Sequence, residues 1–237
     1  MPGLTNPSSS GRCNSNVSHS KARPLNTLVI FDCDGVLVDS ERISHLVMCE
    51  LLAEMDVQIT YEDAILRFIG TSMPTCLARV GELLGHAPPP DFQSRFGQRT
   101  RAAFQASLSP VPGITDVLDC LSTPFCVASN GNRAKVDFTL GHTGLLPRFV
   151  GRIFTAEDVK NPKPAPDLFL HAAATLGADA GRTVVVEDTP TGVMAAKAAG
   201  MRAIGFSAMT PRARLQAAGA DAVASTMAEV GVLLLAQ

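Results

Sequence analysis

Two aspartates stand one residue apart at the end of a short apolar run. The run is Leu28-Val29-Ile30-Phe31, and Asp32, Cys33, Asp34 and Gly35 follow it. An apolar run of this length, bounded by turn residues, is typical of a buried strand in a parallel sheet. At the carboxyl end of such a strand, Asp32 and Asp34 would lie in the crevice where open α/β sheets bind ligands. Two carboxylates this close repel each other unless a cation lies between them, and Mg²⁺, which prefers oxygen ligands, is the cation we expect.

Two other interpretations of this stretch compete. A calcium-binding EF-hand loop needs oxygen ligands at its first, third and fifth positions and glycine at its sixth. Here Gly35 is fourth and Leu37 is sixth, so the EF-hand is rejected. An acidic turn without chemistry stays open on this stretch alone, because aspartate and glycine are ordinary turn residues.

A second polar group follows the apolar run of residues 125–128. Ser129, Asn130 and Gly131 offer a hydroxyl and backbone N–H groups, which form an anion site where a helix begins. Asn-Gly is also a strong hairpin signal, and residues 133–140 alternate polar and apolar as a half-buried strand would. The local rules favour the hairpin, and only the wider pattern of the chain favours the anion site.

Prolines at alternate positions surround Lys163 in the stretch Asn161-Pro162-Lys163-Pro164-Ala165-Pro166. Proline fixes its own φ and restricts the residue before it, so this loop has little backbone freedom. A lysine held in this way is suited to neutralise both an aspartate and a phosphate. The alternative is a rigid surface linker with a solvated lysine, since proline-rich linkers are common.

The elements that must position these residues alternate along the chain. A third apolar run, residues 183–186, ends at Glu187 and Asp188, and a fourth covers residues 202–206. Helical patterns lie between the runs, one of them over residues 190–199. Strands alternating with helices predict an α/β fold with a doubly wound, Rossmann-like parallel sheet. Because the carboxyl ends of parallel strands meet at one edge, we expect the three polar strand ends to converge.

Residues 57–109 carry no buried-strand pattern, and most of this segment has a helical pattern. We therefore expect an all-helical cap over residues 45–109, inserted into a core made of residues 25–44 and 110–237. The helices are expected over residues 61–68, 73–84 and 92–108. Residues 1–24 contain no acidic residue and little apolar surface, which predicts a disordered tail. They lack the apolar core of a secretory signal, and a transit peptide is the less favoured alternative.

The composition excludes several classes of protein. The 237 residues are 46% hydrophobic and 18% charged, as in an ordinary globular protein, with a formal net charge of −2. This net charge gives no indication of a basic surface that would bind nucleic acid or an anionic membrane. No apolar run is long enough to span a bilayer. The six cysteines form no Cys-x-x-Cys pair, so we expect a reducing compartment and a cytoplasmic protein.

Taken together, four motifs in order resemble the haloacid dehalogenase-like hydrolase superfamily. The motifs are Asp32-Cys33-Asp34-Gly35, Ser129-Asn130, Lys163 and Glu187-Asp188. The resemblance covers residues 27–206. The sequences of residues 34–41 and 163–167 resemble those of the phosphoglucomutases and phosphatases that carry a helical cap after the first motif.

The resemblance implies a phosphoryl-transfer mechanism. Asp32 would be the nucleophile that forms an aspartyl-phosphate, and Asp34 would protonate the leaving oxygen and then activate water. Lys163 would stabilise the charge that develops on the phosphoryl oxygens. Mg²⁺ would be bound by Asp32, the backbone carbonyl of Asp34, and Asp188, with Glu187 beside or behind them.

The resemblance also implies where the phosphate binds. Ser129, Asn130 and Gly131 would hold its oxygens from the core, and Gly70 and Thr71 match the cap loop of the family. The partner implied is a small-molecule phosphate ester, and we expect a monomer.

Departures from the mutases of this branch favour simple hydrolysis. Those enzymes carry a histidine at the position of Ser44, whereas this chain has His45, turned by about 100° around the helix. Met73 stands where the mutases have an arginine for a second phosphate. A phosphatase is therefore expected first, a phosphomutase second and a non-catalytic binding protein third. A dehalogenase needs no second aspartate, so Asp34 counts against one.

The substrate is the least defined part of the prediction. Residues 123–131 resemble bacterial sugar-phosphate phosphatases, including those that act on 6-phosphogluconate, so a sugar phosphate or a phosphorylated sugar acid is expected. We hypothesise that Arg95, Arg99 or Arg101 on the cap pairs with a substrate carboxylate. The alternative is a solvated helix face, which is the commoner role of such arginines.

Overall fold

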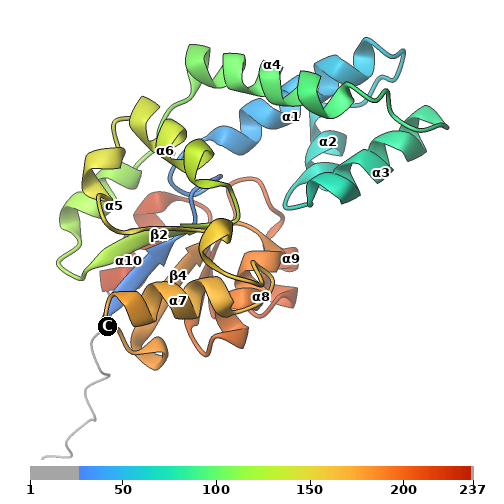
Figure 1. The fold of residues 1–237 in the computed structure, drawn as a ribbon. Helices are drawn as coiled ribbons and strands as arrows, with labels where there is room; N and C mark the ends of the chain where they lie inside the picture. Colours follow the sequence, from blue (N-terminus) through green and yellow to red (C-terminus); the bar gives the residue numbers. More distant parts are fainter. Residues whose placement is uncertain (1–26, 236–237) are drawn as a thin grey trace, which may run out of the picture.

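The computed structural model describes residues 27–235, which form an α/β fold around one parallel sheet (Figure 1). Within these residues the sheet has six strands in the order β3-β2-β1-β4-β5-β6, and every neighbouring pair is parallel. The strands are β1 (Leu28–Phe31), β2 (Phe125–Ser129), β3 (Ile153–Thr155), β4 (Thr183–Glu187), β5 (Arg202–Phe206) and β6 (Ala222–Ala224). The predicted doubly wound sheet is confirmed. The predicted tail, residues 1–24, lies outside the described residues.

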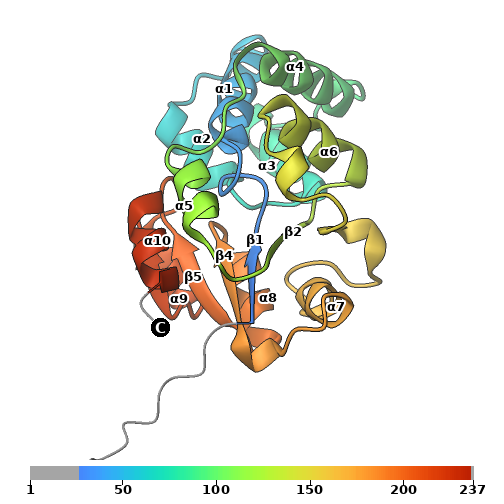
Figure 2. The same ribbon diagram turned by 90° about the vertical axis from the view of Figure 1, so that its left-hand side faces the viewer.

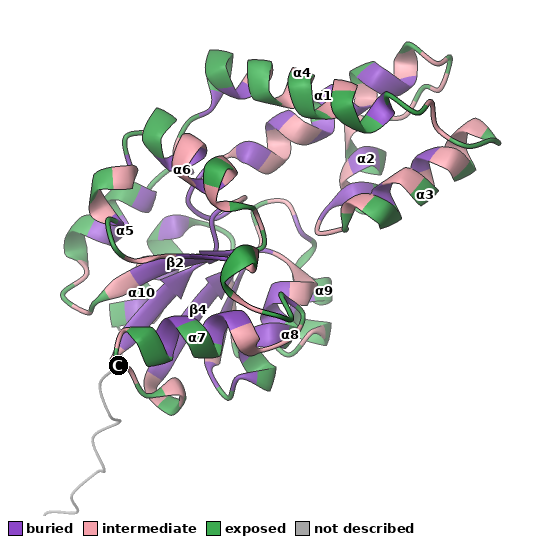
Figure 3. Ribbon diagram, in the orientation of Figure 1, coloured by how far each residue is buried: buried purple, intermediate pink, exposed green. Residues whose placement is uncertain are grey.

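The central strands are buried on both faces, which explains why they read as continuous apolar runs (Figure 3). Val29 and Phe31 of β1 point into one core cluster, and Leu28 and Ile30 point into the other. Strand β1 lies between β2 and β4. The polar residues that follow these three strands are therefore neighbours at the carboxyl edge of the sheet.

Helices cover both faces of the sheet. Residues of α5, α6 and α10 pack in one core cluster, and residues of α7, α8 and α9 pack in the other. The helices are α1 (Ser40–Ala53), α2 (Tyr61–Phe68), α3 (Met73–Leu84), α4 (Phe92–Ser107), α5 (Ile114–Cys120), α6 (Arg133–His142), α7 (Asp167–Thr175), α8 (Pro190–Ala198), α9 (Arg212–Ala217) and α10 (Met227–Leu235). Three short 3₁₀ turns, η1 (Leu146–Arg148), η2 (Ala156–Asp158) and η3 (Ala180–Arg182), complete the described elements.

Helices α1 to α4 gather beyond one edge of the sheet, and α6 is the helix of the sheet layers that lies beside them (Figures 1 and 2). They share a separate apolar cluster that includes Met48 and Leu52 of α1, Phe68 of α2, Val80 of α3 and Phe92 of α4. Helix α1 joins this cluster to the sheet, because Ile43 in its first turns belongs to a core cluster of the sheet. The separate cluster supports the expected helical cap, and the division at residues 45 and 109 stays a prediction.

Two short strands and one helix differ from the sequence-based expectations. Strands β3 and β6, each three residues long at the sheet edges, were not expected, since runs this short carry no measurable periodicity. The hairpin that the local rules favour after Asn130 does not form. Asn132 instead caps helix α6, its side chain accepting a hydrogen bond from the backbone N–H of Lys135 at 2.8 Å. No helix within residues 27–235 has the length and apolar character needed to cross a lipid bilayer.

Candidate active site

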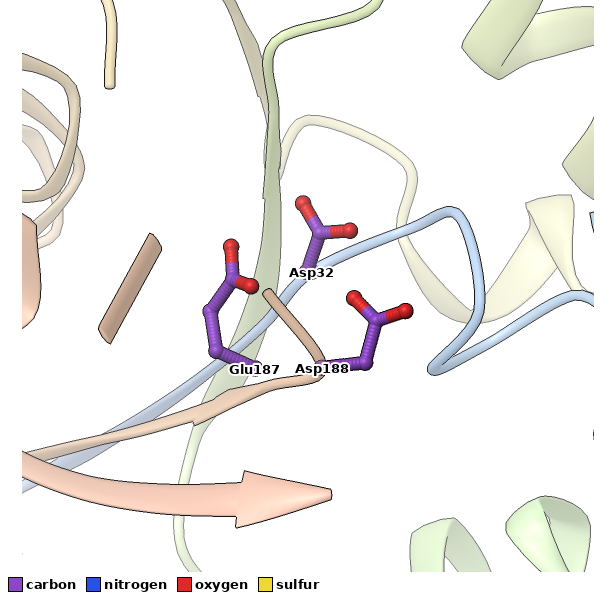
Figure 4. A group of neighbouring side chains, drawn as sticks. All are labelled: Asp32, Glu187 and Asp188. Carbon is purple, nitrogen blue, oxygen red and sulfur yellow. The ribbon is translucent and has the colours of Figure 1, made fainter. Parts of the chain in front are cut away.

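The predicted acidic residues meet at the carboxyl edge of the sheet. Asp32 directly follows β1, Glu187 ends β4, and Asp188 is the next residue (Figure 4). All three side chains are buried, and each offers a carboxylate oxygen within 4.8 Å of the others. The sequence therefore brings three carboxylates from two neighbouring strands to one point.

The acidic cluster of Asp32, Glu187 and Asp188 has more negative charge than its protein surroundings balance. Burial raises the pKa of Asp32 to about 7 against the attraction of Lys163, and repulsion from Glu187 and Asp34 also raises it. Burial, followed by repulsion from Glu187 and Asp32, raises the pKa of Asp188 well above its ordinary value. The Oδ1 atom of Asp188 is buried and has no hydrogen-bond partner. An orphaned, buried carboxylate oxygen is costly unless a cation completes its environment.

These residues fit Mg²⁺, which takes oxygen ligands and accepts one or two protein carboxylates. Asp32, bonded to Lys163 through Oδ1, can offer it Oδ2, and Asp188 can offer Oδ1, whereas both oxygens of Glu187 have other partners. Its Oε1 accepts a hydrogen bond from Lys163, and its Oε2 accepts from the backbone N–H and the hydroxyl of Thr189. Glu187 thus orients the lysine beside the proposed metal site.

Lys163 is the buried cation of the site. Its Nζ donates to Asp32 Oδ1 at 2.6 Å, to Glu187 Oε1 at 2.7 Å and to the carbonyl of Ala128 at 2.8 Å, so all three of its protons are used. The ammonium also lies 4.7 Å from the ring centroid of Phe169. Burial acts to lower the pKa of Lys163, but Asp32 and Glu187 outweigh it and raise the pKa, so the side chain stays charged.

Asn130 fixes the loop that carries this lysine. Its side-chain amide donates to the carbonyl of Lys163 at 2.9 Å, and its amide oxygen accepts from the backbone N–H of Lys163 at 3.0 Å. The Oγ of Ser129 accepts from the backbone N–H of Gly131 at 3.0 Å. The structure thus places Ser129, Asn130 and Gly131 beside Lys163, with the Asn130 side chain turned to the lysine backbone. Their predicted contacts with phosphate stay predictions.

Asp34 has two partners that sequence reasoning missed. Its Oδ1 accepts a hydrogen bond from the Ser40 hydroxyl at 2.6 Å, and its Oδ2 pairs with Lys135 Nζ at 2.8 Å. Burial alone would raise the pKa of Asp34, but Lys135 and Ser40 together lower it, so the carboxylate is ionised. Lys135 lies in the first turn of α6, so it could have been found only by preferring a helix over a hairpin after Asn130.

A cavity of about 210 Å³ opens between the cap helices and α6. Its volume is below the ~300–1,000 Å³ typical of sites for drug-sized ligands, so it suits a small metabolite. The predicted cap-loop residues Gly70 and Thr71 line it. Its other lining residues are Glu41, Ser44, His45, Met48, Phe68, Met73, Cys76, Phe96 and Lys135.

The cap arginines do not line this cavity. Arg95 and Arg99 both pair with Glu54 at 2.5 Å, which joins α4 to the end of α1. The guanidinium of Arg101 lies 4.6 Å from the ring centroid of Phe138. Each of these arginines has another partner in the structure, which disfavours a contact with a substrate carboxylate, and the hypothesis that one of them contacts the substrate stays a prediction.

Comparisons with known proteins identify the family of the chain. A family model described as haloacid dehalogenase-like hydrolase matches residues 29–206. The chloroplastic protein Suppressor of Quenching 1 of Arabidopsis thaliana is 34% identical over 86% of this chain, and this chain spans only 20% of that protein. The 6-phosphogluconate phosphatase of Escherichia coli (strain K12) is 28% identical over 76% of this chain and 82% of the relative.

Solved structures show the same fold over nearly the full chain. A haloacid dehalogenase-like protein of unknown function from Agrobacterium tumefaciens has a TM-score of 0.83 at 36% identity, covering 89% of this chain and 98% of that one. A hydrolase from Deinococcus radiodurans, solved with bound phosphate and sodium, has a TM-score of 0.78 at 32% identity. The match covers 88% of this chain and 95% of that one. Relatives named as phosphatases support the predicted enzyme class, a phosphoric monoester hydrolase. On its sequence, its sheet and the residues gathered at the sheet edge, the chain belongs to the haloacid dehalogenase-like hydrolase family.

Proposed function

We propose that the protein is a Mg²⁺-dependent phosphatase that hydrolyses a small phosphorylated metabolite, a sugar phosphate or a phosphorylated sugar acid, through an aspartyl-phosphate. The observation that carries this proposal is the buried contact of Lys163 with Asp32 and Glu187, beside the orphaned oxygen of Asp188. A fixed ammonium and an incomplete acidic cluster are the parts that phosphoryl transfer requires.

In the first step, an Asp32 oxygen forms a bond to phosphorus while the bond from phosphorus to the leaving oxygen breaks, and Asp34 gives a proton to that oxygen. Asp34 is ionised between Ser40 and Lys135, so it must first take up a proton, and the monoanion of a phosphate ester carries one. In the second step, Asp34 takes a proton from water as the water attacks phosphorus and releases Asp32. Mg²⁺, held by Asp32 and Asp188, would neutralise charge on the phosphoryl group.

A phosphomutase remains the second candidate, and the cavity lining disfavours it. A mutase must bind a second phosphate in the cap. At the position where a mutase would offer an arginine, Met73 lines the cavity. A metabolite with one phosphate is therefore the better fit.

The assay is phosphate release from a panel of phosphorylated sugars and sugar acids, with Mg²⁺ and with a chelator. We expect release only with Mg²⁺, and a loss of at least about 10³-fold in Asp32→Asn and Asp188→Asn. Asp91→Asn is the matched control, because Asp91 is exposed at the start of α4 and its side chain caps nothing. Full turnover without a divalent cation, or full activity of Asp32→Asn, contradicts the proposal. An isomeric product with stimulation by a bisphosphate indicates the mutase.

The proposed partner is a small phosphate ester, and we propose a monomer without nucleic-acid or membrane partners. The net charge of −2 supports the absence of nucleic-acid binding. The cytoplasmic location stays a prediction, since one relative carries a chloroplastic name.

A further inference from the structure

Three polar side chains that line the cap cavity, Ser44, Thr71 and His45, direct their protons at backbone carbonyls. The Ser44 hydroxyl donates to the carbonyl of Ser40 at 2.9 Å, and the Thr71 hydroxyl donates to the carbonyl of Phe68 at 2.7 Å. His45 Nδ1 lies 2.6 Å from the carbonyl of Glu41, and a carbonyl can only accept, so Nδ1 carries the proton.

What these groups offer to a ligand is therefore lone pairs. Ser44 and Thr71 keep hydroxyl oxygens as acceptors, and neutral His45 has an acceptor at Nε2. Burial lowers the pKa of His45, which keeps the ring neutral at pH 7. Glu41, whose side chain is 23% exposed, adds a carboxyl group to the same cavity. The polar lining is thus rich in acceptors.

Positive charge in the cavity is limited to one lysine. Among the residues that line it, Lys135 is the one cation, and its ammonium is paired with Asp34 at 2.8 Å. The remaining lining is apolar and includes Met48, Met73 and Phe96. A second anionic group on a bound ester would have no cation of its own and would lie near Glu41. Such a group loses its hydration without gaining a partner.

We propose that this cavity selects phosphate esters whose leaving group is an uncharged hydroxyl donor, such as a polyol or a sugar, and rejects leaving groups that carry a second anion. The proposal rests on the proposed function and narrows its substrate class. Glu41 and the acceptor-only side chains are the specificity determinants. Hydroxyl groups satisfy the acceptors, whereas a carboxylate or phosphate leaves them unpaired.

Sorbitol 6-phosphate and 6-phosphogluconate form a matched pair of probes. Both are open six-carbon chains with one phosphate, and they differ in the hydroxymethyl or carboxylate group at the far end. At pH 8, with Mg²⁺, we expect kcat/KM for sorbitol 6-phosphate to be higher by roughly 100-fold, with most of the difference in KM. An equal or higher kcat/KM for 6-phosphogluconate overturns the inference.

Binding to Asp32→Asn, measured by calorimetry with Mg²⁺, separates this inference from the proposed function. Tighter binding of sorbitol 6-phosphate supports the selection of uncharged leaving groups even if no ester is turned over, which would contradict the phosphatase alone. Equal binding, or tighter binding of 6-phosphogluconate, overturns the selection whatever the wild-type activity.

Two variants test the determinants directly. Glu41→Gln replaces a carboxylate with an amide that can donate, so the preference for sorbitol 6-phosphate should fall about tenfold, whereas Glu50→Gln, on the exposed side of the same helix, should leave it unchanged. Met73→Arg brings a cation into the cavity and should raise kcat/KM for 6-phosphogluconate selectively. If the preference persists unchanged in both folded variants, these residues do not set it and the inference fails.

Discussion

Gly192 is the residue whose missing side chain makes room for the acidic cluster. A Cβ atom at this position would overlap the carboxylate of Glu187. Gly192 also supplies the backbone N–H that donates to the Thr189 hydroxyl at 3.1 Å, and the same hydroxyl holds Glu187 Oε2. One small residue at the start of α8 therefore permits the position of Glu187, and through it that of Lys163.

We predict that Gly192→Ala lowers kcat/KM by at least about 100-fold and destabilises the fold by about 1–3 kcal/mol, because Glu187 must move in a packed site. Phosphate release and urea unfolding measure the two effects. The matched control is Gly97→Ala in the interior of α4, where a Cβ meets nothing within 4 Å. There the substitution should stabilise the protein by about 0.5–1 kcal/mol and leave activity unchanged. Wild-type activity in Gly192→Ala would contradict this account of Glu187.

Among single residues, those at strand ends could be predicted and those brought in by a helix could not. Asp32, Glu187 and Asp188 follow apolar runs that form neighbouring strands, so the sequence alone predicts that they meet at the edge of the sheet. Lys135 and Ser40 reach Asp34 from two helices, and no spacing in the sequence records that contact. The contacts of the cap arginines with Glu54 and Phe138 likewise depend on tertiary structure and could not be predicted from the sequence.

At the scale of elements, helix α6 shows where local rules fail. The Asn-Gly pair and the alternation after it favour a hairpin, but a strand there would leave the face of the sheet around Val127 uncovered. Val136 and Leu140 of α6 are buried in the same core cluster as Val127. Tertiary burial overrides the local turn preference, as it often does for short segments. The buried strands were predictable because they are continuous apolar runs, and the cap helices were predictable because their periodicity extends over several turns.

Asn132 is the cap on which the first turn of α6 depends. We predict that Asn132→Ala lowers the free energy of unfolding by about 1 kcal/mol, since the backbone N–H of Lys135 loses its acceptor. Urea unfolding measures the loss, and hydrogen exchange should speed up in the amides of residues 133–136. Asn132→Ser keeps an acceptor at this position and should restore most of the stability. A cap role is excluded if the alanine and serine variants are equally stable.

For the whole molecule, the incomplete acidic cluster couples folding to pH. Asp32 has an ordinary pKa of 3.8 and a pKa of about 7 in the folded protein, chiefly because it is buried. Burial and repulsion from Asp34 also raise the pKa of Glu41 to about 7, although Lys135 acts against them. Groups whose pKa is raised by folding hold protons that the unfolded chain releases. Their contribution to stability is therefore complete below about pH 4 and is lost as the pH rises through 7.

Without divalent cations, we predict that the free energy of unfolding falls by on the order of 5 kcal/mol between pH 5 and pH 8, about half of it from each carboxyl group. Mg²⁺ at 100 times its dissociation constant should restore about 2.7 kcal/mol at pH 8, because it binds only the folded cluster. Thermal unfolding with a chelator and with Mg²⁺ measures both effects. Asp188→Asn should weaken both, since it removes one charge of the cluster and replaces one carboxylate oxygen with an NH₂ group that cannot bind a cation. Asp221→Asn, which removes a carboxylate paired with Lys197 on the far side of β5, should leave the Mg²⁺ effect intact. If apo stability is flat with pH and Mg²⁺ adds nothing, the three carboxylates do not form a cation site.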